Sequence, residues 1–192
     1  MKHTVVALVE DKPGVLNRVA SLFRRRGYNI DSLAVGTTHE IGVSRMTIVI
    51  EGNDNMVDQL EKQLYKLIEV IKVENFTSKN SIMRELALIK VKASSQNRRE
   101  ILEILEVFRA QAIDLSTASL VIQIVAHRDT IDALIENLDR FGILEMVRTG
   151  RIAMRRGYTT TTDDEDFNDE DTLRFNSQIG RLTNGNFPFV SD

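Results

Sequence analysis

The chain has 192 residues, of which 42% are hydrophobic and 28% are charged, and its formal net charge is −3. These values are typical of one folded domain or two small ones, and they exclude a disordered polymer. No cysteine is present, which excludes disulfides, thiolate metal sites and cysteine nucleophiles. The first apolar run is too short for a signal peptide or a membrane span, so we expect a cytoplasmic protein, or one of the plastid stroma if the source is algal.

Charge is divided unevenly along the chain. Residues 158–192 contain eight acidic and two basic side chains, a net charge of −6, so residues 1–157 carry +3. A terminal segment that is rich in charge and poor in apolar residues is typical of a solvated tail. We therefore predict an acidic, disordered tail over residues 158–192. Docking of its few leucines and phenylalanines on the basic remainder of the chain, or on a partner, is the alternative.

A strand and a helix meet near the N-terminus with almost no loop between them. The apolar strand covers residues 5–10, and we predict a helix from about Pro13 to Arg26 with Gly27 as its left-handed stop. The first amides of a helix lack intrahelical acceptors and lie at the positive end of its dipole, so an anion placed there is stabilised. Gly14 weakens the first turn, which is reasonable where a ligand or a partner backbone approaches closely. The alternative is that the Pro-Gly pair merely begins the helix.

Hydrophobic periodicity predicts the same order of elements twice. In the first half we expect strands at 5–10, 30–38, 44–51 and 70–77, with helices at 13–26 and from Asn53 or Asp54 to 67. In the second half we expect strands at 86–92, 113–116, 119–126 and 143–149, with helices at 97–111 and 130–141. The predicted fold class is α+β, with two tandem ferredoxin-like βαββαβ domains joined by a polar linker at 78–83. Small units of this kind hide an uncovered sheet face or extend the sheet with a second copy, so we expect a homodimer through the first domain.

No residue pattern indicates catalysis. The sequence lacks the GxGxxG, GxxxxGK[ST], GxSxG and HExxH motifs, and His3, His39 and His127 are scattered over strand ends and turns. We therefore predict no catalytic residue, no bound metal and no cofactor in this chain.

Several spaced motifs resemble one known family, that of the small regulatory subunit of acetolactate synthase (acetohydroxyacid synthase). They are Glu10-Asp11-Lys12-Pro13-Gly14-Val15-Leu16, Arg26-Gly27-Tyr28-Asn29-Ile30, Ser44-Arg45-Met46-Thr47-Ile48 and Arg84-Glu85-Leu86-Ala87-Leu88-Ile89-Lys90. The first half resembles an ACT domain, and the resemblance covers about residues 2–157. It implies an ACT domain over 1–77 for effector binding and dimerisation, and a second small-subunit domain over 84–157.

The resemblance also implies a function in valine, leucine and isoleucine biosynthesis. It implies a non-catalytic subunit that binds the catalytic large subunit, raises its activity and makes it sensitive to feedback inhibition by valine. Thiamine diphosphate, magnesium and FAD are implied on the large subunit and not on this chain. Neither a nucleic acid nor a membrane is an expected partner.

In this family the effector binds between paired ACT domains. The resemblance implies that amides around Gly14, Val15 and Leu16 receive the carboxylate of valine, and that Asn29 of the partner subunit bonds its polar end. We add the hypothesis that Leu16 and Val35 line a pocket for the branched side chain. The candidate effector site is Asp11, Gly14, Val15, Leu16, Asn17, Asn29, Ile30 and Val35.

Two members of this set have open roles. Asp11 stands where members of the family often have asparagine, and its charge either pairs with the ammonium of the ligand or repels its carboxylate. Asn17 either bonds the ligand or the partner, or is a plain surface asparagine.

Two other functions are alternatives. The first is a free-standing amino-acid sensor that acts on nucleic acid or on another enzyme through the positive charge of residues 1–157, although no helix-turn-helix or arginine-rich arm is recognisable. The second is an enzyme in its own right.

Overall fold

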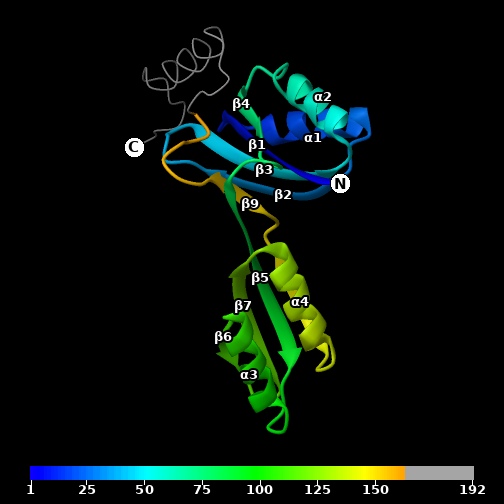
Figure 1. The fold of residues 1–192 in the computed structure, drawn as a ribbon, viewed down its shortest axis with the longest axis vertical. Helices are drawn as coiled ribbons and strands as arrows, with labels where there is room; N and C mark the ends of the chain where they lie inside the picture. Colours follow the sequence, from blue (N-terminus) through cyan, green and yellow to red (C-terminus); the bar gives the residue numbers. More distant parts are fainter. Residues whose placement is uncertain (163–192) are drawn as a thin grey trace. The chain divides into compact units, whose positions relative to one another are not determined.

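The computed structural model describes residues 1–162, which form two compact units. The first unit contains residues 1–82 together with the described residues from Ala153 onward, and the second contains residues 83–152. Each unit has an antiparallel sheet in which four strands and two helices follow the order βαββαβ (Figure 1). The predicted α+β class with two such repeats is confirmed.

The first unit has the strand order β2-β3-β1-β4. Its elements are β1 (Lys2–Glu10), α1 (Val15–Arg26), β2 (Ile30–Thr37), β3 (Val43–Glu51), α2 (Asp54–Leu64) and β4 (Val70–Asn75). Alternate residues of β1 and β3 face the helices and pack with Phe23 of α1 and Leu60 of α2, all of them buried. This packing places both helices on one face of the sheet.

The start of α1 differs from its prediction. The helix begins at Val15, because Gly14 is the N-cap residue and has left-handed φ and ψ angles of 89° and −12°. Pro13 therefore lies in the preceding turn and not at the first helical position. The end of α1 is as predicted, since Gly27 is left-handed and the N–H of Tyr28 donates to the carbonyl of Phe23 at 3.0 Å.

A side-chain cap fixes the start of α2. Oδ1 of Asn53 accepts the backbone N–H of Met56 at 2.9 Å, which confirms asparagine as the cap. On the same helix, burial raises the pKa of Glu61 to about 7, and the neighbouring carboxylates of Asp58 and Glu74 add to the shift. The ammonium of Lys79 and a backbone hydrogen bond from Asn75 act in the opposite direction.

This raised pKa predicts the direction in which stability changes with pH. Since the pKa of Glu61 in the folded chain lies above its ordinary value, the folded state holds its proton more tightly, and stability is lost as pH rises through about 7. Because water screens this partly exposed group, we expect Glu61→Gln to stabilise the chain by only about 1 kcal/mol at pH 8 and by little at pH 5. Urea unfolding at the two pH values measures the difference. The exposed Glu51→Gln is the control, and an equal gain at both pH values would contradict the assignment.

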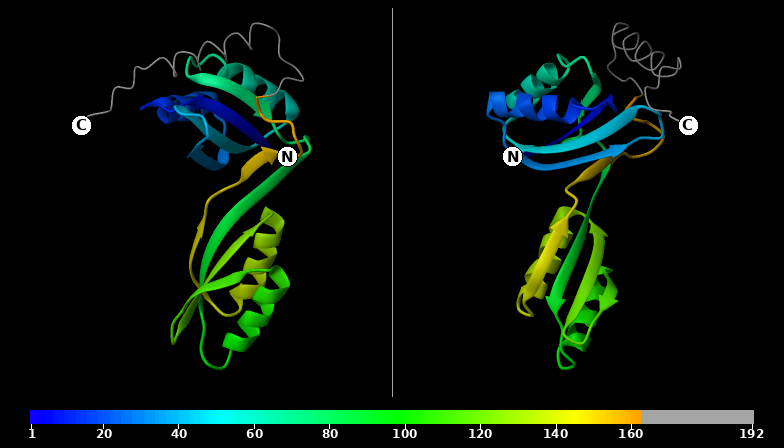
Figure 2. Two further views of the ribbon diagram at one scale, coloured as in Figure 1. Left: turned by 90° about the vertical axis from the view of Figure 1, so that its left-hand side faces the viewer. Right: turned by 180° about the vertical axis from the view of Figure 1, so that it is seen from behind.

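The second unit has the order β6-β7-β5-β8. Its elements are β5 (Ser81–Lys92), α3 (Arg98–Phe108), β6 (Gln111–Leu115), β7 (Ser119–Ala126), α4 (Arg128–Asp139) and β8 (Ile143–Arg148). Both helices cover one face of the sheet, as Figure 2 shows, and the core between them includes Ile89, Ile101, Ile122 and Leu134.

Several boundaries in the second unit differ from their predictions: β6 and α4 each begin two residues earlier than expected, and two differences are larger. The strand β5 begins at Ser81, so residues 81–83, which were expected to be linker, belong to the sheet. The helix α3 ends at Phe108 and not at Gln111, because Arg109 adopts a left-handed φ of 54°. As a result, β6 begins at Gln111, directly after this turn.

A further strand, β9 (Ile152–Arg155), was not predicted and pairs with β5. The chain from Ala153 onward belongs to the first unit, where Ala153 and Thr161 are both buried. Residues 158–162, the start of the predicted tail, are therefore not fully solvated. Residues 163–192, the rest of that tail, lie outside the described residues.

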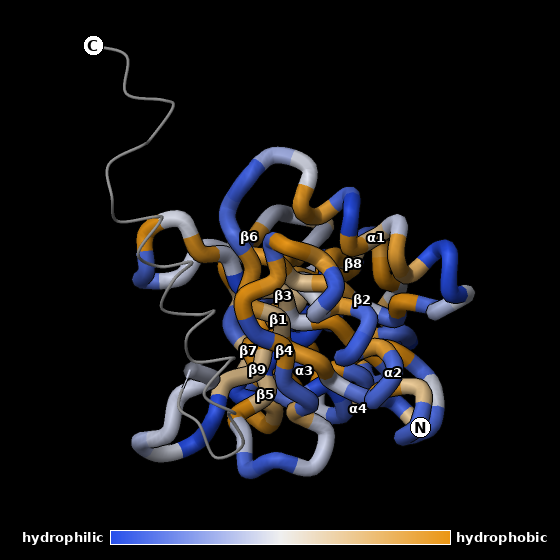
Figure 3. Tube along the Cα trace, turned by 90° about the horizontal axis from the view of Figure 1, so that it is seen from above, coloured by the Kyte–Doolittle hydropathy of each residue, from blue (hydrophilic) through white to orange (hydrophobic). Residues whose placement is uncertain are grey.

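Hydropathy follows this architecture. The strands are largely hydrophobic, whereas many turns are hydrophilic (Figure 3). None of the helices in residues 1–162 is both long enough and apolar enough to cross a membrane.

Candidate functional site

The turn between β1 and α1 presents backbone donors to solvent. Gly14, Leu16 and Asn17 are exposed, and their N–H groups have no protein acceptor within residues 1–162. The N–H of Val15 is already engaged, because it donates to the carbonyl of Lys12 at 3.3 Å. No acidic residue occupies the first turn of α1, so no carboxylate within that turn neutralises the positive end of the helix dipole.

Neighbouring contacts hold this turn in place. The N–H of Asp11 donates to the carbonyl of Gly42 at 2.7 Å, while the Asp11 side chain is exposed. Nζ of Lys12 lies 2.8 Å from Oε2 of Glu10. In the next turn of the helix, Arg18 forms an ion pair with the buried Glu69. The positive charges nearest the turn are therefore paired, and the free amides and the exposed Asp11 carboxylate are the polar groups it offers to a ligand.

Asn29 and Ile30 lie at the opposite end of α1. The helix has 12 residues. At 1.5 Å per residue its length is about 18 Å, which separates Gly14 from Asn29 within one chain. Asn29 is exposed and Ile30 is half-buried at the start of β2. One chain therefore does not bring the two polar parts of the predicted site together.

Leu16 and Val35 lie at the same end of the unit. The cross-strand pairs Glu10 with Val43 and Thr37 with Ser44 show that β1 and β2 both finish at the same end of the sheet, beside the start of β3. Val35 is opposite Met46, whose side chain is in the core beneath the helices, so Val35 lies on the helix-covered face. Leu16 of α1 is 45% exposed and Val35 is 47% exposed, so both offer apolar surface to solvent.

The strand β2 is an edge of its sheet. Within the described chain it pairs only with β3, through the register from Ile30 with Ile50 to Thr37 with Ser44. An edge strand is the part of a sheet where a further strand can pair.

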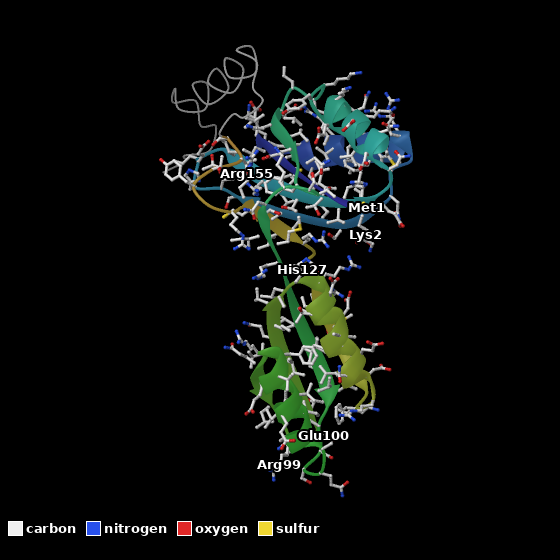
Figure 4. The ribbon with its side chains drawn as sticks, in the orientation of Figure 1. Met1, Lys2, Arg99, Glu100, His127 and Arg155 are labelled. Atoms are coloured by element: carbon white, nitrogen blue, oxygen red, sulfur yellow. The ribbon has the colours of Figure 1, made fainter. Side chains whose placement is uncertain are left out.

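A second polar cluster lies in the first unit and was missed by the sequence analysis. The guanidinium of Arg155 on β9 (labelled in Figure 4) forms an ion pair with Glu74 of β4, and Nζ of Lys79 lies 3.2 Å from Oε1 of the same carboxylate. Arg45 of β3 donates to the carbonyl of Ala153 at 2.7 Å. These residues are up to 110 positions apart, and a local sequence pattern does not predict contacts over such a separation. Across residues 1–162, no cluster of histidine and acidic side chains is arranged to hold a metal ion.

Comparison with known proteins gives consistent matches. A family model described as the small subunit of acetolactate synthase matches residues 84–157, and one described as the small-subunit-like ACT domain matches residues 6–72. A probable acetolactate synthase small subunit from Archaeoglobus fulgidus is 53% identical over 157 residues, covering 82% of this chain and 98% of that protein. The small subunit from Mycolicibacterium smegmatis is 49% identical over 155 residues, covering 81% of this chain and 91% of that protein.

A solved structure agrees with these sequences. The crystal structure of the acetolactate synthase small subunit from Thermotoga maritima has a TM-score of 0.77 and 41% identity, covering 83% of this chain and 99% of that one. The chain therefore belongs to the acetolactate synthase small subunit family, regulatory subunits that carry an ACT domain and serve a catalytic large subunit.

Proposed function

We propose that two copies of this chain bind valine between their first units, activate the catalytic large subunit of acetolactate synthase and make it sensitive to inhibition by valine. The observation that carries the proposal is the separation of Gly14 and Asn29 at the two ends of α1, which a two-fold arrangement of copies removes.

The free amides of Gly14 and Leu16 suit the carboxylate of valine. A hydrogen bond to a charged group contributes about 1.5 to 3 kcal/mol, more than one between neutral groups. The helix dipole adds to the attraction at this end. Asn17, one residue further along α1, offers an additional free amide and a polar side chain.

The register of the sheet indicates how two copies complete the site. When the β2 strands of two copies pair antiparallel about a two-fold axis, the end of one β2 lies opposite the start of the other. Gly14 is at the end of the sheet where β2 stops, and Asn29 immediately precedes the residue where β2 starts. Gly14 of one copy thus approaches Asn29 of the partner subunit, and the dimer has two equivalent sites.

The exposed apolar residues suit the branched side chain of valine. Leu16 and Val35 offer surface beside the amides, and Ile30 stands at the start of β2, where the partner would contribute it. Asp11 is exposed beside the same turn, and its carboxylate suits the ammonium group of the amino acid. Because valine contacts both copies, it binds the paired arrangement better than a separated one, and this difference in affinity is what allows it to change the state of the large subunit.

In this proposal the catalytic reaction is carried out by the large subunit. We assign thiamine diphosphate, magnesium and FAD to the large subunit, and assign this chain a regulatory and non-catalytic role. The rate of acetolactate formation by the large subunit, with and without this chain and with increasing valine, tests activation and feedback together. No change in rate on adding the chain, or no effect of valine on the complex, would remove the corresponding part of the proposal.

Mixing two inactive variants tests the shared site directly. Gly14→Asp and Asn29→Ala damage opposite halves of each site, so neither variant alone binds valine. A dimer with one copy of each has one damaged site with both changes and one intact site. After random exchange we expect calorimetry to recover about a quarter of the wild-type valine capacity, because half of the dimers are mixed and each has one good site.

The control is Asn29→Ala mixed with wild-type chain, which sets the capacity expected for known proportions. If the two variants never restore binding on mixing, both halves of the site belong to one chain or lie elsewhere, and the two-fold site is wrong.

A further inference from the structure

A cavity of about 380 Å³ lies in the first unit, on the sheet face opposite the helices. The strands contribute Leu8, Val43 and Arg45, whose positions alternate with those of the helix-facing core residues. The other walls come from the turn after β2 and from residues 154–162. None of the residues proposed to bind valine lines this cavity, and its volume is that of a pocket for a small molecule.

Arg45 is the informative residue in this cavity. Its Nη1 donates to Oγ1 of Thr161 at 2.9 Å and its Nη2 to the carbonyl of Ala153 at 2.7 Å. Its guanidinium carbon lies 5.6 Å from the centre of the Phe76 ring. All three contacts are to neutral groups, and burial lowers the pKa of the guanidinium. A guanidinium has five N–H donors, so this one retains donors for a further acceptor.

No carboxylate within residues 1–162 forms an ion pair with Arg45. Glu74 attracts it through space, but Oε1 of Glu74 is taken by Arg155 and Lys79, and its Oε2 makes no hydrogen bond. Glu40 also lines the cavity, and its Oε1 lies 3.9 Å from Nε2 of His39. Glu74 is therefore engaged by Arg155 and Lys79, whereas the hydrogen bonds and the ring contact of the Arg45 guanidinium are to neutral groups.

A partly buried guanidinium whose contacts are all to neutral groups favours an anion. Arginine prefers a carboxylate or a phosphate, which it holds through paired parallel hydrogen bonds. Leu8, Val43 and Met154 supply apolar walls, which suit a ligand with an apolar body better than inorganic phosphate. We propose that this cavity binds a carboxylate and that Arg45 holds it.

Two sources supply this chemistry. One is a free small carboxylate with a branched apolar body. The other is this chain, because Asp163, Asp164, Glu165 and Asp166 follow directly after Thr162, which lines the cavity. The test must therefore compare the full chain with a full-length variant in which these four residues are replaced by asparagine or glutamine.

The probe is isobutyrate, and isobutyramide is its neutral control of the same shape. Methyl NMR of Met154, which lines the cavity, reports binding, with its signal assigned by Met154→Leu. We expect isobutyrate and not isobutyramide to shift this signal in a saturable manner. Because the carboxylate contact is charge-assisted, Arg45→Gln weakens binding by about tenfold or more. The exposed Arg156→Gln, an equal change in net charge, alters binding by less than about twofold.

The two sources give different results. Equal binding to the wild-type chain and to the neutralised variant identifies a free carboxylate as the ligand. Binding that is much tighter in the neutralised variant identifies carboxylates of residues 163–166 as the occupants. The proposal is overturned if isobutyrate shifts nothing in either protein, if isobutyramide binds equally well, or if Arg45→Gln and Arg156→Gln have the same effect.

Discussion

In the Gly14→Asp variant we expect valine to lose its inhibition of the complex with the large subunit, while activation by the small subunit remains. The new carboxylate lies at the free amides and faces the carboxylate of valine. Two like charges about 4 Å apart repel by about 4 kcal/mol at the effective dielectric constant of a protein surface. The apparent affinity for valine should therefore fall by about 100-fold or more, which inhibition curves and calorimetry both measure.

Backbone strain requires its own control at this position. A Cβ added to Gly14 meets no heavy atom within 4 Å, but φ is +89°, where most side chains are strained. Gly14→Asn has nearly the same shape as the aspartate and tolerates this conformation at least as well, without the charge. We expect Gly14→Asn to keep most of the valine sensitivity. Equal loss in both variants would assign the effect to the backbone, and full sensitivity in Gly14→Asp would refute this site.

In the Arg148→Met variant we expect a large loss of unfolding free energy in the second unit. Arg148 donates from Nε and Nη2 to both oxygens of Glu85, at 2.6 and 3.0 Å, and from Nη1 to Oδ1 of Asp132 at 2.6 Å. These bonds, with Glu85 contributing most, raise the pKa of Arg148. Removing the guanidinium leaves the buried Glu85 carboxylate without its charged partner, at a cost of about 3 kcal/mol in unfolding free energy.

An exposed ion pair of the same unit provides the matched control. Nε of Arg99, at the start of α3 (Figure 4), lies 3.0 Å from Oε1 of Glu103, and the side chains are 91% and 61% exposed. Arg99→Met should change the unfolding free energy by less than about 0.5 kcal/mol. Urea unfolding followed through amide signals of β5 and β7 compares the two variants. Similar losses in both would show that burial of Glu85 does not determine the cost.

The sequence predicted the features that depend on neighbouring residues. Hydrophobic periodicity was sufficient for both βαββαβ repeats, and Asn53 and Gly27 marked a helix start and a helix end. The start of α1 was misplaced because a Pro-Gly pair suits both a turn and a first helical turn. The end of α3 was misplaced because Arg109 adopts a conformation that arginine rarely takes.

Other features depend on residues that are distant in sequence. The four-residue strand β9 is too short for its periodicity to be detected, and its contacts with Arg45 and Glu74 join segments about 80 to 110 residues apart. For the proposed valine site, motif resemblance indicated which residues to consider, and the length of α1 and the register of β2 led to the proposal of a second copy. Occupancy by valine stays a prediction.

The return of Ala153–Thr162 to the first unit makes that unit discontinuous in sequence. During synthesis, the helix-covered face of the first sheet can form once β4 has been made, but the partners of Arg45 on the other face are still about 80 residues from emerging. The whole second unit must leave the ribosome first. Leu8 and Val43, which are buried and line the cavity together with residues from Met154 onward, therefore belong to a surface that is completed late. A nascent chain halted near residue 82 is thus the state in which we expect this protein to be most prone to aggregation.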